Sequence, residues 1–172
     1  GWTRNEANDF FSGTEDIPLI LVEQPLPASD LDGLHLLKNK FQRLVSVDES
    51  LQTPDSVENI LKKDAADVFS IKISKNGGLR SSHDIGKKVA AQGKKILMNS
   101  MIELGITQCA SLHLGCVFEN LMDCGHAYMS TLRTSDDVTN FSSWIDKGAA
   151  KLRDEPGLGV KVDSERINKY LE

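Results

Sequence analysis

The sequence of 172 residues has few cysteines, few aromatic residues and no long apolar run. Its three cysteines, Cys109, Cys116 and Cys124, are odd in number and show no Cys-x-x-Cys spacing, so they indicate neither a disulfide framework nor a zinc site. His113 lies between two of them at helical spacing. The surrounding residues "QCASLHLGCVF" are apolar, however, which favours a packed helix face with core thiols over a metal site.

Signals for a membrane or for nucleic acid are also missing. No apolar run approaches the roughly 20 residues of a membrane-spanning helix, and the first residues, "GWTRNEANDFF", lack the pattern of a signal peptide. Lysine and arginine are scattered, and the formal net charge is -5, which argues against a nucleic-acid surface. We therefore expect a cytoplasmic protein, or one in an organelle lumen whose targeting segment is missing, without membrane or nucleic-acid partners.

The remaining composition is that of a globular protein able to bury a core, with 40% hydrophobic and 26% charged residues. Strand-like runs alternate with helix-like runs, which is typical of parallel βα units. A helix cap is expected at Ser29 or Asp30 and another at Thr53. Strands are predicted at 18–23, 44–48, 68–73, 95–98 and near 120–124, and helices at 29–41, 53–63, 79–93 and roughly 102–118.

The spacing of these strands favours a barrel. They recur about every 25 residues, close to the roughly 30 that a (β/α)8 barrel gives to each unit. Five units cannot close eight strands, so the sequence predicts the later part of a longer barrel, with an open α/β sheet as the alternative. Residues 1–135 are assigned to the partial barrel and 136–172 to a polar C-terminal segment that ends in a short helix.

Charged side chains occur at the ends of three successive predicted strands. Lys72 lies on the strand face opposite Phe69 and Ile71, where a charge is costly unless it is needed. The same alternation puts Glu23 and Asp48 at the ends of the two preceding strands. Barrels and open α/β sheets both carry their active sites at the carboxyl ends of the strands. We therefore predict that Glu23, Asp48 and Lys72 meet there.

This combination of groups predicts a metal site with a base. Two carboxylates suit Mg2+, which completes its shell with water and substrate. Burial and a nearby cation lower the pKa of a lysine, which makes a lysine usable as a general base. The alternative is a structural ion pair between Lys72 and Asp48. Glu49 is a candidate partner for a lysine of the site, and Lys75, which follows the strand with the opposite parity, is expected in a surface loop.

Five motifs then carry a resemblance. The stretches "EQPLP", "VDESL", "IKISKNGG", "NSMIELG" and "PGLGVKVD", in this order and spacing, resemble the later part of the mandelate racemase and muconate lactonising branch of the enolase superfamily. The resemblance spans nearly the whole chain. It implies a TIM-type (β/α)8 barrel without its N-terminal capping domain and first strands. It also implies Mg2+ bound by Glu23 and Asp48, with Lys72 as the acid/base residue.

The resemblance implies a reaction as well. A proton alpha to a carboxylate is abstracted, which gives an enolate intermediate. This intermediate is either reprotonated, as in racemases and epimerases, or loses a leaving group, as in dehydratases. A lyase or isomerase acting on a small carboxylate is therefore expected. The family's Asp-x-Asn and Lys-x-Lys motifs are absent, so the chain as given is expected to be incomplete for activity, and a noncatalytic barrel remnant is an alternative. A homo-oligomeric parent is left open, and residues 136–172 are expected to pack on the barrel or on the missing capping domain.

The stretch "NLMDCGHAYMSTLRTSDDV" falls where substrate specificity is sorted in this family. It looks more like hydroxyproline dehydratases and proline-derivative racemases than like dipeptide epimerases with their Asp-x-Asp pattern. It therefore predicts a cyclic amino acid substrate, with muconate-type cycloisomerase and dipeptide epimerase as alternatives. Asp123 and His126 are predicted to contact the substrate, or else to be solvated in a loop turn, and Ser100 and Glu103 are predicted to line the pocket.

Overall fold

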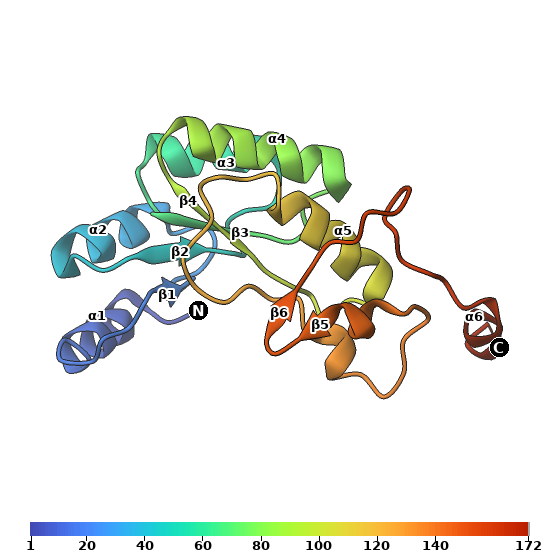
Figure 1. The fold of residues 1–172 in the computed structure, drawn as a ribbon. Helices are drawn as coiled ribbons and strands as arrows, with labels where there is room; N and C mark the ends of the chain where they lie inside the picture. Colours follow the sequence, from blue (N-terminus) through green and yellow to red (C-terminus); the bar gives the residue numbers. More distant parts are fainter. Residues whose placement is uncertain (172) are drawn as a thin grey trace.

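Four parallel strands form the central sheet of the computed structural model, which describes residues 1–171 (Figure 1). Their spatial order β1-β2-β3-β4 is also their order in the chain. A doubly wound sheet reverses its strand order at a switch point, whereas the wall of a barrel keeps it. The order therefore confirms the barrel-like prediction. The strands are β1 (Val22–Glu23), β2 (Val45–Val47), β3 (Val68–Ile71) and β4 (Lys95–Met98).

A helix follows each of these strands, and one more precedes the first. The helix α2 begins after Asp30, whose carboxylate accepts from the backbone of Gly33, so the cap is Asp30 and not Ser29. The helix α3 begins after Thr53, the predicted cap, and Thr53 also forms a capping box with Ser56. The helices are α1 (Arg4–Gly13), α2 (Leu31–Phe41), α3 (Pro54–Lys62), α4 (Gly78–Ala91) and α5 (Gly105–Gly115). Within residues 1–171, none of the helices is both long and apolar enough to cross a membrane.

The strand β4 has the predicted bounds, whereas β1, β2 and β3 are shorter than predicted, β1 most of all. Residues 18–21 precede β1 in irregular conformation, because β1 pairs only with β2 and Pro18 has no amide hydrogen to donate. The predicted fifth strand is reduced to one parallel bridge between Ile96 and Leu121. The βα rhythm is therefore correct, but strand length depends on pairing partners that a local pattern does not show.

The two faces of the sheet differ as the alternation predicts. Phe69 and Ile71 are fully buried in the main apolar cluster. On the opposite face, the hydroxyls of Ser46 and Ser70 lie 3.2 Å apart, and both side chains are buried. The interior of the partial barrel is thus polar at this level, and the apolar face packs toward the helices.

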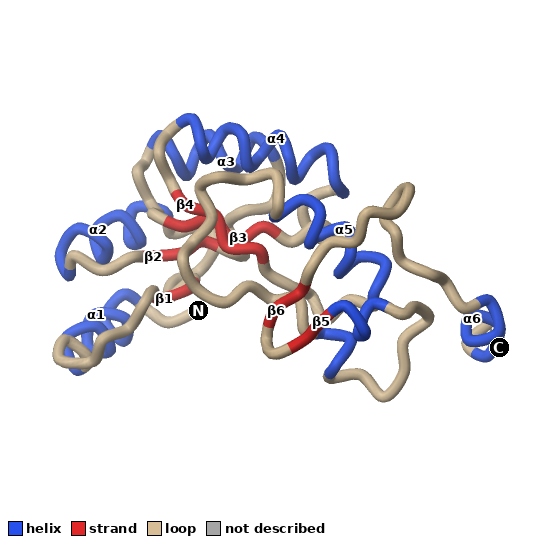
Figure 2. The backbone as a smooth tube through the Cα atoms, viewed as in Figure 1, coloured by secondary structure: helices blue, strands red, loops and turns tan. Residues whose placement is uncertain are grey.

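The C-terminal segment packs against α5. Phe141 and Trp144 of η2 (Phe141–Trp144) form an apolar cluster with Cys109 and Leu112. The short strands β5 (Ile145–Asp146) and β6 (Ala149–Ala150) pair antiparallel. The helix α6 (Ser164–Lys169) lies apart from the sheet, at the right of Figures 1 and 2. The other short helix is η1 (Ser130–Leu132). The predicted boundary between 135 and 136 stays a prediction.

The cysteines do not share one environment. Cys109 is buried, Cys124 is half-buried and Cys116 is exposed. Cys116 caps the end of α5, where the helix meets solvent, so its prediction as a core thiol is wrong. The ring of His113 contacts the carbonyl oxygen of Leu158 at 3.1 Å, which agrees with a packed helix face.

Candidate functional site

Glu23, at the end of β1, connects three strands of the sheet. Its Oε1 accepts hydrogen bonds from Ser70 Oγ at 2.5 Å and from Asn99 Nδ2 at 2.8 Å. Asn99 follows β4, the opposite edge of the sheet, which in a flat sheet would lie about 14 Å from β1. Direct contact between these side chains therefore requires a curled sheet, as in the wall of a barrel.

Asp48 and Lys72 meet at the same edge. Lys72 Nζ lies 2.6 Å from Asp48 Oδ2, and the two side chains are only 11% and 10% exposed. Asp48 follows β2 and Lys72 follows β3, so the contact joins the carboxyl ends of neighbouring strands. The ion pair that the sequence offered as an alternative is thus present, and Glu23 reaches the same pair of strands through Ser70.

Lys75 corrects the expectation of a surface loop. Its side chain is 10% exposed, and its Nζ donates to Asp48 Oδ1 at 2.6 Å and to the Asp48 carbonyl at 2.7 Å. The strand ends at Ile71, and the backbone amides of Lys75 and Asn76 both donate to the carbonyl of Lys72. Because the chain turns here, the two-residue alternation no longer applies, and Lys75 points back to the edge.

The charges at this edge balance. Burial is the largest influence on Asp48 and would raise its pKa, but the hydrogen bonds from Lys72 and Lys75 outweigh it and the pKa is lowered. Burial lowers the pKa of Lys75, and the contact with Asp48 only partly opposes this. With Glu23, two carboxylates and two lysines gather at the edge.

Three amide side chains that sequence reasoning missed orient these groups. Gln24 Oε1 accepts from the amide of Asp48 at 2.9 Å. Asn76, which is 1% exposed, accepts from the amide of Lys72 at 2.9 Å. Asn99 donates to Glu23. Each follows a strand end within a recognised motif, so position could have indicated them, but the sequence argument considered charged residues alone.

Ser100 and Glu103 form a second polar network beyond β4. Glu103 Oε2 accepts from Ser100 Oγ at 2.5 Å and from Gln108 Nε2 at 3.0 Å, and its Oε1 accepts from Ser74 Oγ at 2.7 Å. Burial would raise the pKa of Glu103, but the hydrogen bonds from Ser100, the Met101 backbone and Ser74 lower it. This network holds the loop that follows Lys72 by way of Ser74.

His126 is held next to β4. Its Nδ1 accepts from the amide of Met98 at 3.2 Å, which requires the neutral tautomer with its proton on Nε2, and burial lowers the pKa of the ring. It lines a cavity of about 540 Å³ together with Tyr128 and Lys147.

Asp123 and Glu49 do not join the site. Both side chains are exposed, and within residues 1–171 neither makes a hydrogen bond or an ion pair with another side chain or backbone group. The structure therefore places Asp123 at the surface. Glu49 acts on the site only through space: its charge raises the pKa of Lys75, against the larger effect of burial.

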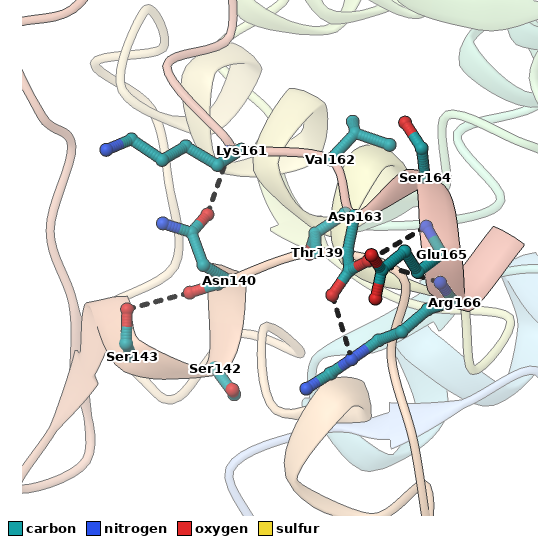
Figure 3. A pocket seen from close by; sticks show the side chains of 10 residues that line it. All are labelled: Thr139, Asn140, Ser142, Ser143, Lys161, Val162, Asp163, Ser164, Glu165 and Arg166. Atoms are coloured by element: carbon teal, nitrogen blue, oxygen red, sulfur yellow. Dashed lines mark hydrogen bonds and ion pairs between the residues drawn. The ribbon is translucent and has the colours of Figure 1, made fainter.

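A cavity of about 670 Å³ lies away from the strand edge, between residues 139–143 and 161–166 (Figure 3). Its polar groups satisfy one another: Asn140 accepts from the Lys161 amide at 2.8 Å, and Asp163 pairs with Arg166 at 3.2 Å. None of the predicted site residues lines it. This cavity is a junction of the C-terminal segment and not the candidate site.

The donor set at the edge fits Mg2+. Among residues 1–171, no three Cys, His, Asp or Glu side chains gather as a metal cluster, so the edge supplies two carboxylates. In the described chain Glu23 Oε2 accepts no hydrogen bond, because both of its donors bind Oε1. Magnesium often takes one or two protein carboxylates and fills its octahedral shell with water and substrate.

Comparison with known proteins supplies the family. Residues 1–167 match the family described as Enolase C-terminal domain-like. The chain belongs to this family. Muconate cycloisomerase 1-1 of Acinetobacter lwoffii is 30% identical over 169 residues, which cover 98% of this chain and 44% of that protein. N-succinyl-L-Arg/Lys racemase of Bacillus cereus is 24% identical over 171 residues, covering 98% and 45%.

Solved structures support the fold. A muconate lactonizing enzyme from Pseudomonas putida superposes with a TM-score of 0.92 at 23% identity, over 98% of this chain and 47% of that one. The chain thus spans less than half of the length of each of these three proteins. These findings confirm the predicted α/β class and the later part of a TIM-type barrel, whereas the resemblance to hydroxyproline dehydratases stays a prediction.

Proposed function

We propose that this chain carries the metal-binding and base half of a site that abstracts a proton alpha to a carboxylate. Glu23 and Asp48 are the metal ligands, and Lys72 is the acid/base residue. The observation that carries the proposal is the convergence of these three groups at the carboxyl edge, with Lys72 and Asp48 buried and 2.6 Å apart. Mg2+ bound there supplies positive charge that stabilises the negative charge developing on the substrate carboxylate.

The protein's own groups perform the proton transfer. Proton abstraction requires the Lys72 amine in its neutral form, with its lone pair directed at the substrate. Asn76 fixes the backbone of Lys72 and Gln24 fixes that of Asp48, so both side chains start from defined positions. Lys72 and Asp48 are buried, which strengthens the electrostatic interaction between them, whereas Glu23 at the same edge is exposed.

The substrate class follows from the relatives only in outline. The relatives include proteins named as a muconate cycloisomerase, an L-Ala-D/L-Glu epimerase and an N-succinyl-L-Arg/Lys racemase. We propose a small carboxylate for this chain, followed by reprotonation or elimination. A hydroxyproline-like cyclic amino acid is the finer proposal, based on the "DCGHA" stretch and on His126, which lines a cavity.

The test is exchange of the alpha proton in D2O with Mg2+, followed by proton NMR. The probes are 4-hydroxyproline, N-succinyl-L-lysine and L-Ala-L-Glu. Lys72→Met should slow exchange at least about a hundredfold, since positioned acid/base groups contribute that much or more. Lys63→Met is the matched control, because Lys63 pairs with Asp32 on the surface. Exchange that persists in Lys72→Met, or that does not need Mg2+, would contradict the proposal.

A noncatalytic barrel is the second candidate, and the Lys72–Asp48 ion pair favours it. In that case the pair would serve stability alone, no probe would exchange, and Mg2+ would not bind. Half of a site can bind Mg2+ without exchanging a proton, so the binding of Mg2+, and its loss in Asp48→Asn, is the result that separates the two candidates.

A further inference from the structure

Lys75 uses all of its donors within the protein. Its Nζ has three acceptors, Asp48 Oδ1 at 2.6 Å, the Asp48 carbonyl at 2.7 Å and the Ser70 carbonyl at 3.3 Å. An ammonium group has three N–H donors, so none remains for a substrate. With a side chain that is 10% exposed, Lys75 is built into the edge and is not a substrate contact.

The two oxygens of Asp48 are bound by different lysines. Oδ1 faces Lys75, which is fixed by the two backbone carbonyls, whereas Oδ2 faces Lys72, whose Nζ donates only to Oδ2 among the residues described. A cation that approached Oδ1 would meet a fixed positive charge in a poorly solvated place. Oδ2 is the less firmly occupied oxygen, because Lys72 Nζ is held by Oδ2 alone among the residues described, without the two backbone carbonyls that fix Lys75.

We propose that Lys75 sets the metal preference of the site by restricting Asp48 to one coordinating oxygen. The proposal rests on the magnesium site proposed above and goes beyond it. Mg2+ demands a compact octahedron, to which a carboxylate can give a single oxygen, whereas Ca2+ takes six to eight oxygens and often binds a carboxylate through both. Lys75 is therefore a positioning residue that disfavours Ca2+.

The experiment is calorimetric titration of Mg2+ and of Ca2+ into the chain and into Lys75→Met, which keeps an unbranched stem but removes the ammonium group. The wild-type chain should bind Mg2+ more tightly than Ca2+. In Lys75→Met, Oδ1 is released and the ratio of the two affinities should shift toward Ca2+ by about tenfold.

Lys72→Met is the matched control. It removes the same charge from the other oxygen of the same carboxylate, which strengthens the attraction for any cation. Both affinities should rise together, and their ratio should stay at the wild-type value. A merely structural or electrostatic role for Lys75 would give the same result in both variants.

Three results would overturn the proposal. The first is a wild-type chain that binds Ca2+ as tightly as Mg2+. The second is a Lys75→Met variant whose affinity ratio equals that of Lys72→Met. The third, no binding of either cation, would remove the magnesium site itself, so it is distinct from the other two.

A further variant is used if circular dichroism shows that Lys75→Met is unfolded. Lys75→Arg keeps the positive charge and the donors, so it should keep the wild-type ratio of the two affinities. A ratio shifted toward Ca2+ in Lys75→Arg would count against the proposal.

Discussion

The sheet has an aspartate flanked by two lysines at each of its ends. At the carboxyl edge, Asp48 pairs with Lys72 and Lys75. At the amino edge, before β3 and β4, Asp64 pairs with Lys38 at 2.7 Å and with Lys94 at 2.5 Å. The two clusters have the same composition, so an aspartate between two lysines is not by itself a sign of function.

The two clusters differ in the burial of the central aspartate and in the second carboxylate that lies beside it. Asp64 is 47% exposed, whereas Asp48 is 10% exposed. The second carboxylate at the amino edge, Asp67, accepts from the Val45 amide and pairs with Lys38, so it serves the scaffold. At the carboxyl edge the second carboxylate is Glu23, which has an oxygen free of hydrogen bonds from the described residues. The comparison matches the general division of barrels into a stabilising amino face and an active carboxyl face.

The largest expected effect on stability comes from the amide side chains at the two edges. Asn76→Ala should lower the free energy of unfolding by about 3 kcal/mol, because it leaves the Lys72 amide and the Leu51 carbonyl buried without partners. Asn120→Ala, at the amino edge, loses one bond to the Lys94 carbonyl and should cost about 1 kcal/mol. Urea unfolding measures both. Equal losses would contradict the expectation that Asn76, with two buried backbone partners, stabilises the fold more than Asn120, with one.

A smaller effect is expected from the amino-edge ion pairs, and it depends on pH. Burial would raise the pKa of Asp64, but Lys38 and Lys94 lower it below the unfolded value of about 3.9. Its stabilisation is therefore complete above that value and is lost as the pH falls through the folded pKa. Because Asp64 is half exposed and screened by solvent, Asp64→Asn should cost only about 1 kcal/mol at neutral pH.

The pH series provides its own check. The unfolding free energies of Asp64→Asn and of the wild-type chain should converge as the pH falls below the unfolded pKa of about 3.9 and through the lower folded pKa. Asp9→Asn is the control, since Asp9 is exposed on α1 and makes no ion pair within residues 1–171. A constant difference across the series would show that Asp64 acts through packing and not through its charge.

The sequence predicted the strand-end charges because parity is a local property. Lys72 and Asp48 lie as the two-residue alternation requires, on the side of the sheet that carries Ser46 and Ser70. Lys75 was misplaced because the chain turns after Ile71, and a turn closed by backbone hydrogen bonds has no strand parity. The cluster around Asp64 was missed because its lysines come from the helix α2 and from the turn before β4, which meet only in the folded chain.

The motifs predicted more than parity could. Five short stretches in order indicated a barrel fragment, which the strand order and the family match confirm. They left open whether Asp123 contacts the substrate or is solvated in a loop turn, and the structure has it exposed, because the orientation of a loop depends on its tertiary neighbours. The curl of the sheet, seen in the contact of Glu23 with Asn99, likewise follows from the assembled strands and not from any one of them.

The central claim is that the carboxyl edge, and not the amino edge, binds a divalent cation. Its most direct test is calorimetric titration of Mg2+ into the wild-type chain, Asp48→Asn and Asp64→Asn, two variants that each remove one charge from an aspartate held by two lysines. Mg2+ should bind to the wild-type chain and to Asp64→Asn with similar affinity, and Asp48→Asn should abolish binding. Equal binding by all three chains, or loss of binding in Asp64→Asn alone, would contradict the assignment of the site.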